Sequence, residues 1–281
     1  MDPVLARKMS RSLEPYHGII YFLPEATEAY AQLGVTGRDG YFASRSAPLG
    51  AVSAGVVIAT FFNFNPTLVQ HAIPSAWDKT TPTAILDARL AAIDLGLRRL
   101  LGDDVVESKD VARAADLARV AAEGCTIPGR PLYAGHASLA WPTEPHLVLW
   151  HAISLIREFR GDGHIACLVA EELDAVEALI THAASGAVPR VALQTSRAWS
   201  DDAWNAGIER LAARGIVTGD GEFTDAGRAL RERIEAQTDV LALPAWEALG
   251  DDGCNELREL GRPWSRAIAD SGAFAVLPGS R

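Results

Sequence analysis

Cysteine is scarce in this sequence, with three residues among 281, at positions 125, 167 and 254, and no CxxC pair. Isolated cysteines in an odd number argue against a disulfide framework and against a zinc site built on thiolates. The N-terminus lacks the apolar run of a signal peptide. The apolar stretch over residues 50–64 is too short to cross a membrane. These absences predict a reduced, cytoplasmic protein.

Positive charge is also in deficit. Lys and Arg total 26 against 36 Asp and Glu, so the formal net charge is −10. A domain that binds nucleic acid usually presents a basic face, so this balance disfavours DNA as a partner. The sequence likewise contains no Walker loop, no dinucleotide-binding glycine fingerprint, and no GxSxG or HExxH motif. Nucleotide, hydrolase and metalloprotease chemistry therefore have no signature here.

The clearest structural pattern lies in residues 200–237. Apolar residues at Trp204, Ile208 and Leu211 are spaced three to four apart, which predicts a helix that ends near Gly215. A short hairpin would follow, and the Thr224 hydroxyl would then cap a second long helix by accepting from its free amides. Helix, hairpin and capped helix in this order are the second half of a winged helix-turn-helix unit.

This segment resembles MarR-type regulators, whose reading helix and wing carry comparable residues. The matching positions are Leu211, Gly215, Ile216, Phe223, Thr224 and Gly227. The whole chain is also similar to an actinobacterial group of helix-turn-helix proteins. The resemblance implies transcriptional control and, as in many MarR relatives, a pocket for phenolic ligands.

The charges of this unit do not suit DNA. The predicted reading helix begins with Asp201 and Asp202, although such a helix enters the major groove by its first turns and phosphate contact needs Lys or Arg. The predicted wing tip is acidic at Asp220 and Glu222. Acids at the helix start also complement the helix dipole, with or without DNA. The fold therefore points to DNA, whereas the surface argues against it.

The first half of the chain shows a similar order of elements, which suggests an internal duplication. We expect a mainly α fold with two winged-helix-like (MarR-like) halves that form a pseudo-dimer, the first half lacking a proper wing. The expected parts are a degenerate winged-helix-like half over residues 1–124, a Pro-rich linker or lid over 125–146, and a MarR-like half over 147–281. The chain would be a monomeric pseudo-dimer or a homodimer. Chance similarity between helical Ala- and Leu-rich segments is the alternative.

Four residues would converge at the join if the halves pack about a pseudo-two-fold axis: His17, Tyr41, His151 and His164. Imidazole nitrogens there could act as acid and base near neutral pH, or could hold haem or a divalent metal ion. His164, Tyr41 and His151 are the catalytic candidates. No recognised metal-ligand spacing occurs, so no metal site is predicted. The alternative for each histidine is a hydrogen-bonded core or surface residue.

The candidates for ligand binding are Arg160, Arg45, Asn63 and His17. An arginine can hold a carboxylate or phosphate through two parallel hydrogen bonds. A buried amide needs hydrogen-bond partners, and Asn63 lies among three aromatic residues. The alternatives are a solvated Arg45 and an Asn63 that bridges to a neighbouring backbone.

Two short segments predict helix boundaries. Gly161 or Gly163 suits the left-handed end of one helix, and Asp162 suits the N-cap of the next. Asn65 before Pro66 predicts another N-cap, because proline is tolerated in the first helical turn.

The leading hypothesis is a small-molecule-binding protein, with or without catalysis, whose pocket between the halves takes an aromatic or apolar ligand. We expect no DNA and no membrane partner. The alternative is a ligand-responsive MarR-type transcriptional regulator that contacts phosphates through Arg190, Arg210 and Arg214. A third class is an interaction module without a pocket.

Overall fold

The fold is known from a computed structural model that describes residues 1–275. Helices make up the regular structure of this range, in which no strand occurs, so the predicted mainly α class is confirmed. The α-helices are α1 (Pro3–Gly18), α2 (Pro24–Gln32), α3 (Gly37–Ser46), α4 (Ala54–Phe61), α5 (Pro66–Ala72), α6 (Pro82–Leu101), α7 (Asp103–Val106), α8 (Lys109–Glu123), α9 (Pro131–Ala137), α10 (Pro145–Ala170), α11 (Ala175–Ala184), α12 (Arg190–Arg197), α13 (Asp201–Ala213) and α14 (Asp225–Asp270). Short 3₁₀ helices are η1 (Ile19–Phe22), η2 (Ala47–Leu49) and η3 (Ala273–Ala275).

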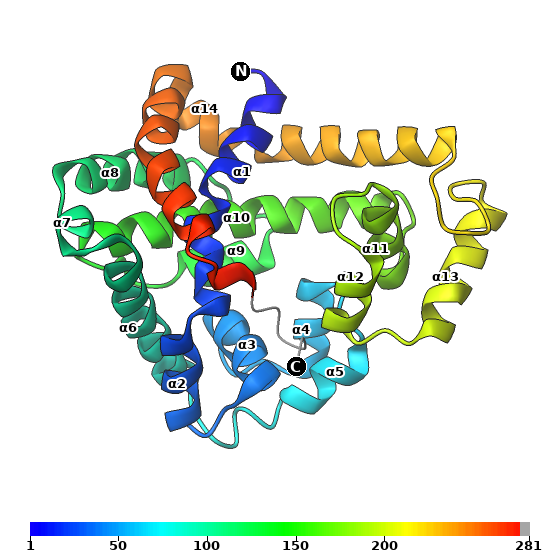
Figure 1. Cartoon of the computed structure of the whole chain (residues 1–281), viewed down its shortest axis with the longest axis horizontal. Coiled ribbons are helices and arrows are strands. Elements are labelled where there is room, and N and C mark those ends of the chain that lie inside the picture. Colours follow the sequence, from blue (N-terminus) through cyan, green and yellow to red (C-terminus); the bar gives the residue numbers. More distant parts are fainter. Residues whose placement is uncertain (276–281) are drawn as a thin grey trace.

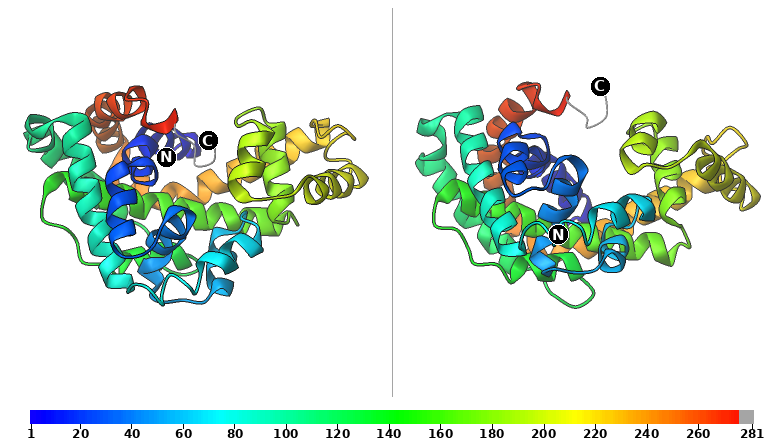
Figure 2. Two further views of the ribbon diagram at one scale, coloured as in Figure 1. Left: turned by 60° about the horizontal axis from the view of Figure 1, so that its bottom comes forward. Right: turned by 90° about the horizontal axis from the view of Figure 1, so that it is seen from below.

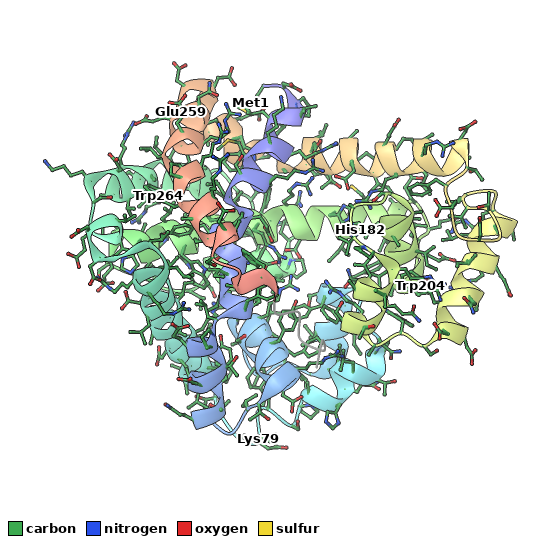
Figure 3. All side chains as sticks on the ribbon, in the orientation of Figure 1. Met1, Lys79, His182, Trp204, Glu259 and Trp264 are labelled. Atoms are coloured by element: carbon green, nitrogen blue, oxygen red, sulfur yellow. The ribbon has the colours of Figure 1, made fainter. Side chains whose placement is uncertain are left out.

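Two hydrophobic cores divide the molecule into a large body and a smaller lobe. The body core draws on α1 to α9, the first part of α10 and the second part of α14, around buried residues such as Phe42 and Trp246. The lobe core lies between the end of α10, α11 to α13 and the start of α14, around the buried Trp204. Figure 2 shows the body and the lobe side by side, and Figure 3 labels Trp204 in the lobe.

Two long helices connect the body and the lobe. α10 and the first part of α14 pack on each other and run from the body into the lobe (Figure 1). α14 bends at Gly250, whose φ of 76° interrupts the helical backbone. Beyond the bend, Trp264 meets Tyr16 of α1 with 6.5 Å between ring centroids. The predicted boundary near residue 146 therefore falls at the start of a helix that serves both cores.

The predicted helix, turn and capped helix are present after α12. α13 ends before Gly215, and Thr224 caps α14 by accepting from the Gly227 amide at 3.1 Å. The hairpin between them is reduced to one antiparallel bridge, Val217 to Phe223. The order α11, α12, α13 suits a helix-turn-helix unit, while the MarR-like wing and the pseudo-dimer stay predictions.

The helix break predicted within α10 is wrong. The helix continues through Gly161 and Gly163, and Asp162 caps no new helix. A Cβ at Gly163 would lie 2.0 Å from Nη1 of Arg130, so the glycine lets this guanidinium group pack close to the helix. Asp162 instead accepts a hydrogen bond from the Tyr133 amide at 2.9 Å.

The segment predicted as a linker or lid packs on the body. It contains α9, which contacts α10 and η2. Arg130, just before α9, donates to the carbonyl of Phe159 at 2.6 Å and to that of Leu241 at 2.9 Å. These hydrogen bonds tie the segment to both long helices.

The first half follows the predicted order of helices but packs differently. The order of elements in the first half matches that of the second half, with α4, α5, α6 and α8 corresponding to α11, α12, α13 and α14. The short helix α7 lies where the second half has its hairpin. In the lobe, α11 packs on α13, whereas α6 packs on α2 and α3. Internal duplication therefore stays a prediction.

Within residues 1–275, no single helix has the length and apolar composition needed to cross a membrane. The segments 37–49 and 54–61 meet that criterion only when they are counted together, and they are bent by 92°.

Candidate functional site

A cavity of about 440 Å³ lies between the body and the lobe. Its walls come from α1, α3, the end of α4, the middle of α10, α11, the end of α12 and α14. Elements of both cores line it, so its shape depends on how the lobe sits on the body. Figure 3 labels His182, a lining residue on α11, at the side of the lobe that faces the body.

The cavity is rich in arginine although the chain as a whole is acidic. Seven arginines line it against four acidic residues, whereas the whole chain has a formal net charge of −10. The arginines are Arg7, Arg11, Arg45, Arg157, Arg160, Arg197 and Arg231, and the acids are Glu14, Glu158, Asp162 and Glu235. An excess of cationic groups around a concave, partly desolvated space favours an anionic ligand.

Glu158 of α10 is a buried acid at the base of this cavity. Its side chain is 1% exposed and accepts from Arg45 Nη2 at 3.1 Å and from Arg157 Nη1 at 3.0 Å. Burial alone would raise the pKa of Glu158, but the two guanidinium groups hold it well below its usual range. Arg45 also donates to the Tyr41 hydroxyl at 3.1 Å, which holds the phenol at the cavity wall.

Arg197, at the end of α12, has no acidic partner within residues 1–275. Its Nη1 lies 2.8 Å from Ser196 Oγ, and its guanidinium lies 5.0 Å from the ring centroid of Phe64. Its Nε is buried and has no hydrogen-bond partner in that range. Burial lowers the pKa of Arg197, but a guanidinium remains charged in proteins. Because no carboxylate neutralises this guanidinium within residues 1–275, the part of it that lines the cavity is suited to bind an anionic oxygen.

Three phenylalanines at the end of α4 give the cavity an apolar wall. Phe61 and Phe64 belong to the body core, and the Arg45 guanidinium lies 4.4 Å from the Phe61 centroid. Phe62 packs against the lobe core and has a φ of 57°, which is unusual for an aromatic residue. Strained backbone of this kind persists only where the surrounding structure enforces it, and it is common at functional sites.

Hydrogen bonds fix the turn after α4 to the lobe. The Asn65 amide donates to the Arg197 carbonyl at 3.0 Å, and Trp199 Nε1 donates to the Asn63 carbonyl at 3.0 Å. Asn65 also caps α5 by accepting from the Thr67 amide at 2.9 Å, as predicted. The position of Arg197 relative to the aromatic wall is therefore set by the backbone.

His164 of α10 lines the cavity as a neutral ring. Thr238 Oγ1 donates its proton to the Ile234 carbonyl at 2.7 Å, so it accepts from His164 Nδ1 at 3.0 Å. The proton therefore sits on Nδ1, and Nε2 keeps its lone pair. Burial, followed by the charge of Arg231, lowers the pKa of His164 to about 4. This ring can accept a hydrogen bond or a proton from a ligand.

A second ion-pair cluster borders the cavity on α14. The side chain of Asp239 is 1% exposed and pairs with Arg7 at 2.6 Å and with Arg160 at 3.0 Å. Glu235 lies 3.5 Å from Arg160. These carboxylates neutralise Arg7 and Arg160, so both are less available for an anion than Arg197.

The cavity brings together five of the residues predicted from the sequence. Tyr41, Arg45, Asn63, Arg160 and His164 all line it. Their placement is observed, while their roles in binding or catalysis stay predictions.

The predicted convergence of His17 and His151 with these residues is not observed, because neither lines the cavity. His17 is buried, with Nδ1 2.8 Å from Ser154 Oγ and Nε2 3.0 Å from the Tyr21 hydroxyl. The ring of His151 packs edge-on against Trp141 with 4.8 Å between centroids. At about 100° of rotation per helical residue, position 151 faces a different side of α10 from position 164.

Sequence reasoning considered Arg157 beside Arg160 as a group that could hold a carboxylate or phosphate, but it did not select Arg197, Glu158 or His182 as site residues. Glu158 carried a signal, since an acid stood beside Arg157 inside an otherwise apolar helix. Arg197 carried none, because its aromatic neighbour and backbone partner come from the turn after α4, far away in the sequence.

Within residues 1–275, no group of three or more His, Cys, Asp or Glu side chains is placed to hold a metal ion. The cysteines at positions 125, 167 and 254 are free thiols. His17, a candidate ligand of haem or metal from the sequence, engages both ring nitrogens in hydrogen bonds.

Comparison with protein families gives a match over nearly the whole chain. A model described as a helix-turn-helix family covers residues 6–275. A search of curated proteins and a search of solved structures found no match.

Proposed function

Because the chain belongs to this helix-turn-helix family, we propose that it uses the fold to bind a small organic anion in the cavity between body and lobe. The observation that carries the proposal is Arg197. It is a cavity arginine without an acidic partner in residues 1–275, and its guanidinium lies over an aromatic wall. A carboxylate or phosphate would bind the part of this guanidinium that lines the cavity.

The other walls match the remainder of such a ligand. An apolar or aromatic ring would pack against Phe61 and Phe64, which already border the cavity. His164 would offer Nε2 as a hydrogen-bond acceptor, and Tyr41 would offer its phenol. The cavity volume of about 440 Å³ also lies within the range of about 300–1,000 Å³ that small-molecule sites commonly have.

The surface of the helix-turn-helix unit supports a role without DNA. Asp201 and Glu209 are exposed on α13, where a reading helix would need cationic or neutral groups. Arg190 lies 3.2 Å from Asp201, and Arg210 lies 2.6 Å from Asp174. Two of the arginines that could contact phosphate are thus paired within the fold.

The test is calorimetric titration with a panel of small aromatic carboxylates and phosphates, using the amide or alcohol of each as a neutral control. We expect members of the panel to bind, their neutral counterparts to bind weakly, and Arg197→Gln to reduce affinity by about 10- to 100-fold, the range for a hydrogen bond to a charged group.

The matched control is Arg190→Gln, an arginine on the same helix that does not line the cavity. It removes the same charge from the molecule, so it should leave affinity unchanged. Equal affinity of both variants, or no binding by any anion of the panel, would contradict the proposal.

The second candidate is a ligand-responsive transcriptional regulator, which membership of a helix-turn-helix family favours. A mobility-shift assay with fragments of the source genome tests it. Sequence-specific, salt-sensitive binding that Arg210→Glu abolishes would establish the regulator and would overturn a role without DNA.

A further inference from the structure

A second cavity of about 890 Å³ lies in the body beside the arginine-rich one. Six residues line both cavities: Arg11, Glu14, Tyr41, Phe64, Arg157 and Arg197. The two spaces therefore meet at a wall that contains the proposed anion anchor. A ligand held at Arg197 has room on either side of that wall.

The second cavity has a different chemical character from the first. Much of its lining consists of aliphatic and aromatic side chains from η1, α2, α3, α5 and the residue between η1 and α2, such as Ile20, Leu23, Ala26, Phe42 and Leu68. Several belong to the body core. Apart from the arginines that both cavities share, Arg38 is the one arginine that lines it within residues 1–275, and this group donates to the Thr195 carbonyl at 3.1 Å.

Aromatic rings border the place where the two cavities meet. The rings of Tyr21 and Tyr41 stand edge to face with 5.3 Å between centroids, and Tyr41 meets Phe64 at 5.7 Å. Tyr21 lines the second cavity, whereas Tyr41 and Phe64 line both. A chain or ring system that passes from Arg197 into the second cavity would thus contact aromatic faces first and aliphatic groups beyond.

We propose that the second cavity holds the apolar body of the same ligand whose anionic group binds Arg197. The ligand class is an amphipathic organic anion, with a carboxylate or phosphate at one end and an extended acyl or aromatic body. This inference rests on the proposed function, because it uses the same anchor. It adds the size and polarity of the remainder of the ligand.

Calorimetric titration with straight-chain carboxylates from butanoate to dodecanoate tests the proposal, with dodecanol as the neutral control. Affinity should rise roughly fourfold per added methylene, the value for burying a CH₂ group, until the second cavity is filled. Leu68→Trp, which adds an indole ring to the wall of that cavity, should reduce the gain from chain length while leaving butanoate binding unchanged. Arg197→Gln should weaken every member of the series.

A second variant with a larger side chain in the cavity lining distinguishes a loss of cavity space from a folding defect of the first variant. Thr27→Trp places the new ring at an exposed lining position of the second cavity and should also flatten the dependence on chain length. Circular dichroism shows whether each variant keeps its helices. Leu95→Trp, at an exposed site that lines neither cavity, is the matched control.

The outcomes separate this inference from the proposed function. Anions that bind through Arg197 with no dependence on chain length would overturn the inference and leave the proposed function standing. Long chains that bind equally well to Arg197→Gln, or dodecanol that binds as well as dodecanoate, would overturn both. Failure of every straight-chain carboxylate to bind, while aromatic anions too small to extend into the second cavity do bind through Arg197, would overturn the inference alone.

Discussion

The carboxylate of Glu158 receives hydrogen bonds from arginines on two different helices, Arg45 on α3 and Arg157 on α10. It is nearly inaccessible to solvent, so its charge is compensated by the protein and not by water. Removing one partner of a buried ion pair leaves uncompensated charge in a poorly solvated place. The Glu158 carboxylate therefore holds two arginines of the cavity wall in place and also contributes to the stability of the fold.

We expect Glu158→Ala to lower the free energy of unfolding by about 3–5 kcal/mol, the cost of breaking a buried pair. Urea unfolding followed by circular dichroism measures it. The control is Glu256→Ala, which removes a carboxylate that forms a comparable but exposed pair with Arg113 and should change stability little. A similarly small change in the free energy of unfolding of both variants would show that the buried pair contributes no more to stability than the exposed one.

At the scale of single elements, the contact between the turn after α13 and the start of α14 depends on a glycine. A Cβ at Gly227 would lie 2.0 Å from the Ile216 carbonyl oxygen and 2.7 Å from Phe223 Cδ1. The first of these is a backbone atom, so the turn itself would have to move. The lobe core next to it contains Ile216 and has Phe223 packed against it.

Gly227→Ala should therefore destabilise the protein by about 1–3 kcal/mol, the usual cost of overpacking, despite the better helix propensity of alanine. The measurement is again urea unfolding, followed by circular dichroism. Gly55→Ala is the control, because a Cβ there meets nothing closer than 3.7 Å. A gain in stability at both positions would contradict the packing argument.

Local signals predicted the ends of several elements. The N-caps Thr224 and Asn65 could be predicted from the sequence because each capping side chain accepts from a backbone amide only two or three positions further on. The break expected at Gly163 failed for the opposite reason. Its neighbour Arg130 comes from a different segment, and no pattern within α10 announces that a guanidinium will pack on the helix there.

At the scale of the whole molecule, packing places several histidines out of contact with water. Burial lowers the pKa of His136 to about 3 and the pKa of His151 to about 4, and it does the same for His164, to about 4. Each of these rings is neutral in the folded state near pH 5 and protonated in the unfolded chain. Unfolding therefore takes up protons between pH 6.5 and about 4.

The free energy of unfolding should consequently fall as the pH falls from 7 to 5, by up to about 1.4 kcal/mol per pH unit for each proton taken up. Asp162 acts in the opposite direction, because burial raises its pKa to about 6 and the folded state then holds the extra proton. One such group offsets only part of the effect of three histidines. Urea unfolding at several pH values measures the net slope.

His151→Gln should reduce this slope by the contribution of about one proton taken up on unfolding. His71→Gln, at an exposed position, should leave it unchanged. A stability that is flat or rises between pH 7 and 5 would contradict the assignment of these rings as neutral.

The candidate site was only partly readable at this scale. Arg45, Asn63 and Arg160 could be selected because each was a polar residue in an apolar or aromatic context. Tyr41 and His164 were instead selected from the expected pseudo-two-fold packing of the halves, which stays a prediction, although both line the cavity. Arg197 could not be selected, since its importance depends on the angle at which the lobe meets the body. The prediction placed His151 wrongly because it divided this segment into two helices, which could have brought positions 151 and 164 together. In the continuous helix α10, the two positions face different sides.

The contrast between an acidic exterior and a basic cavity has a kinetic consequence. A net charge of −10 repels an anion that approaches from solution, whereas the arginines attract it once it has entered. Because the Debye length is about 8 Å at physiological ionic strength, added salt screens the approach more than the final contact. Added salt should therefore increase the association rate of the anion and also increase its dissociation rate. Because both rates rise, an equilibrium affinity alone would not reveal these two effects.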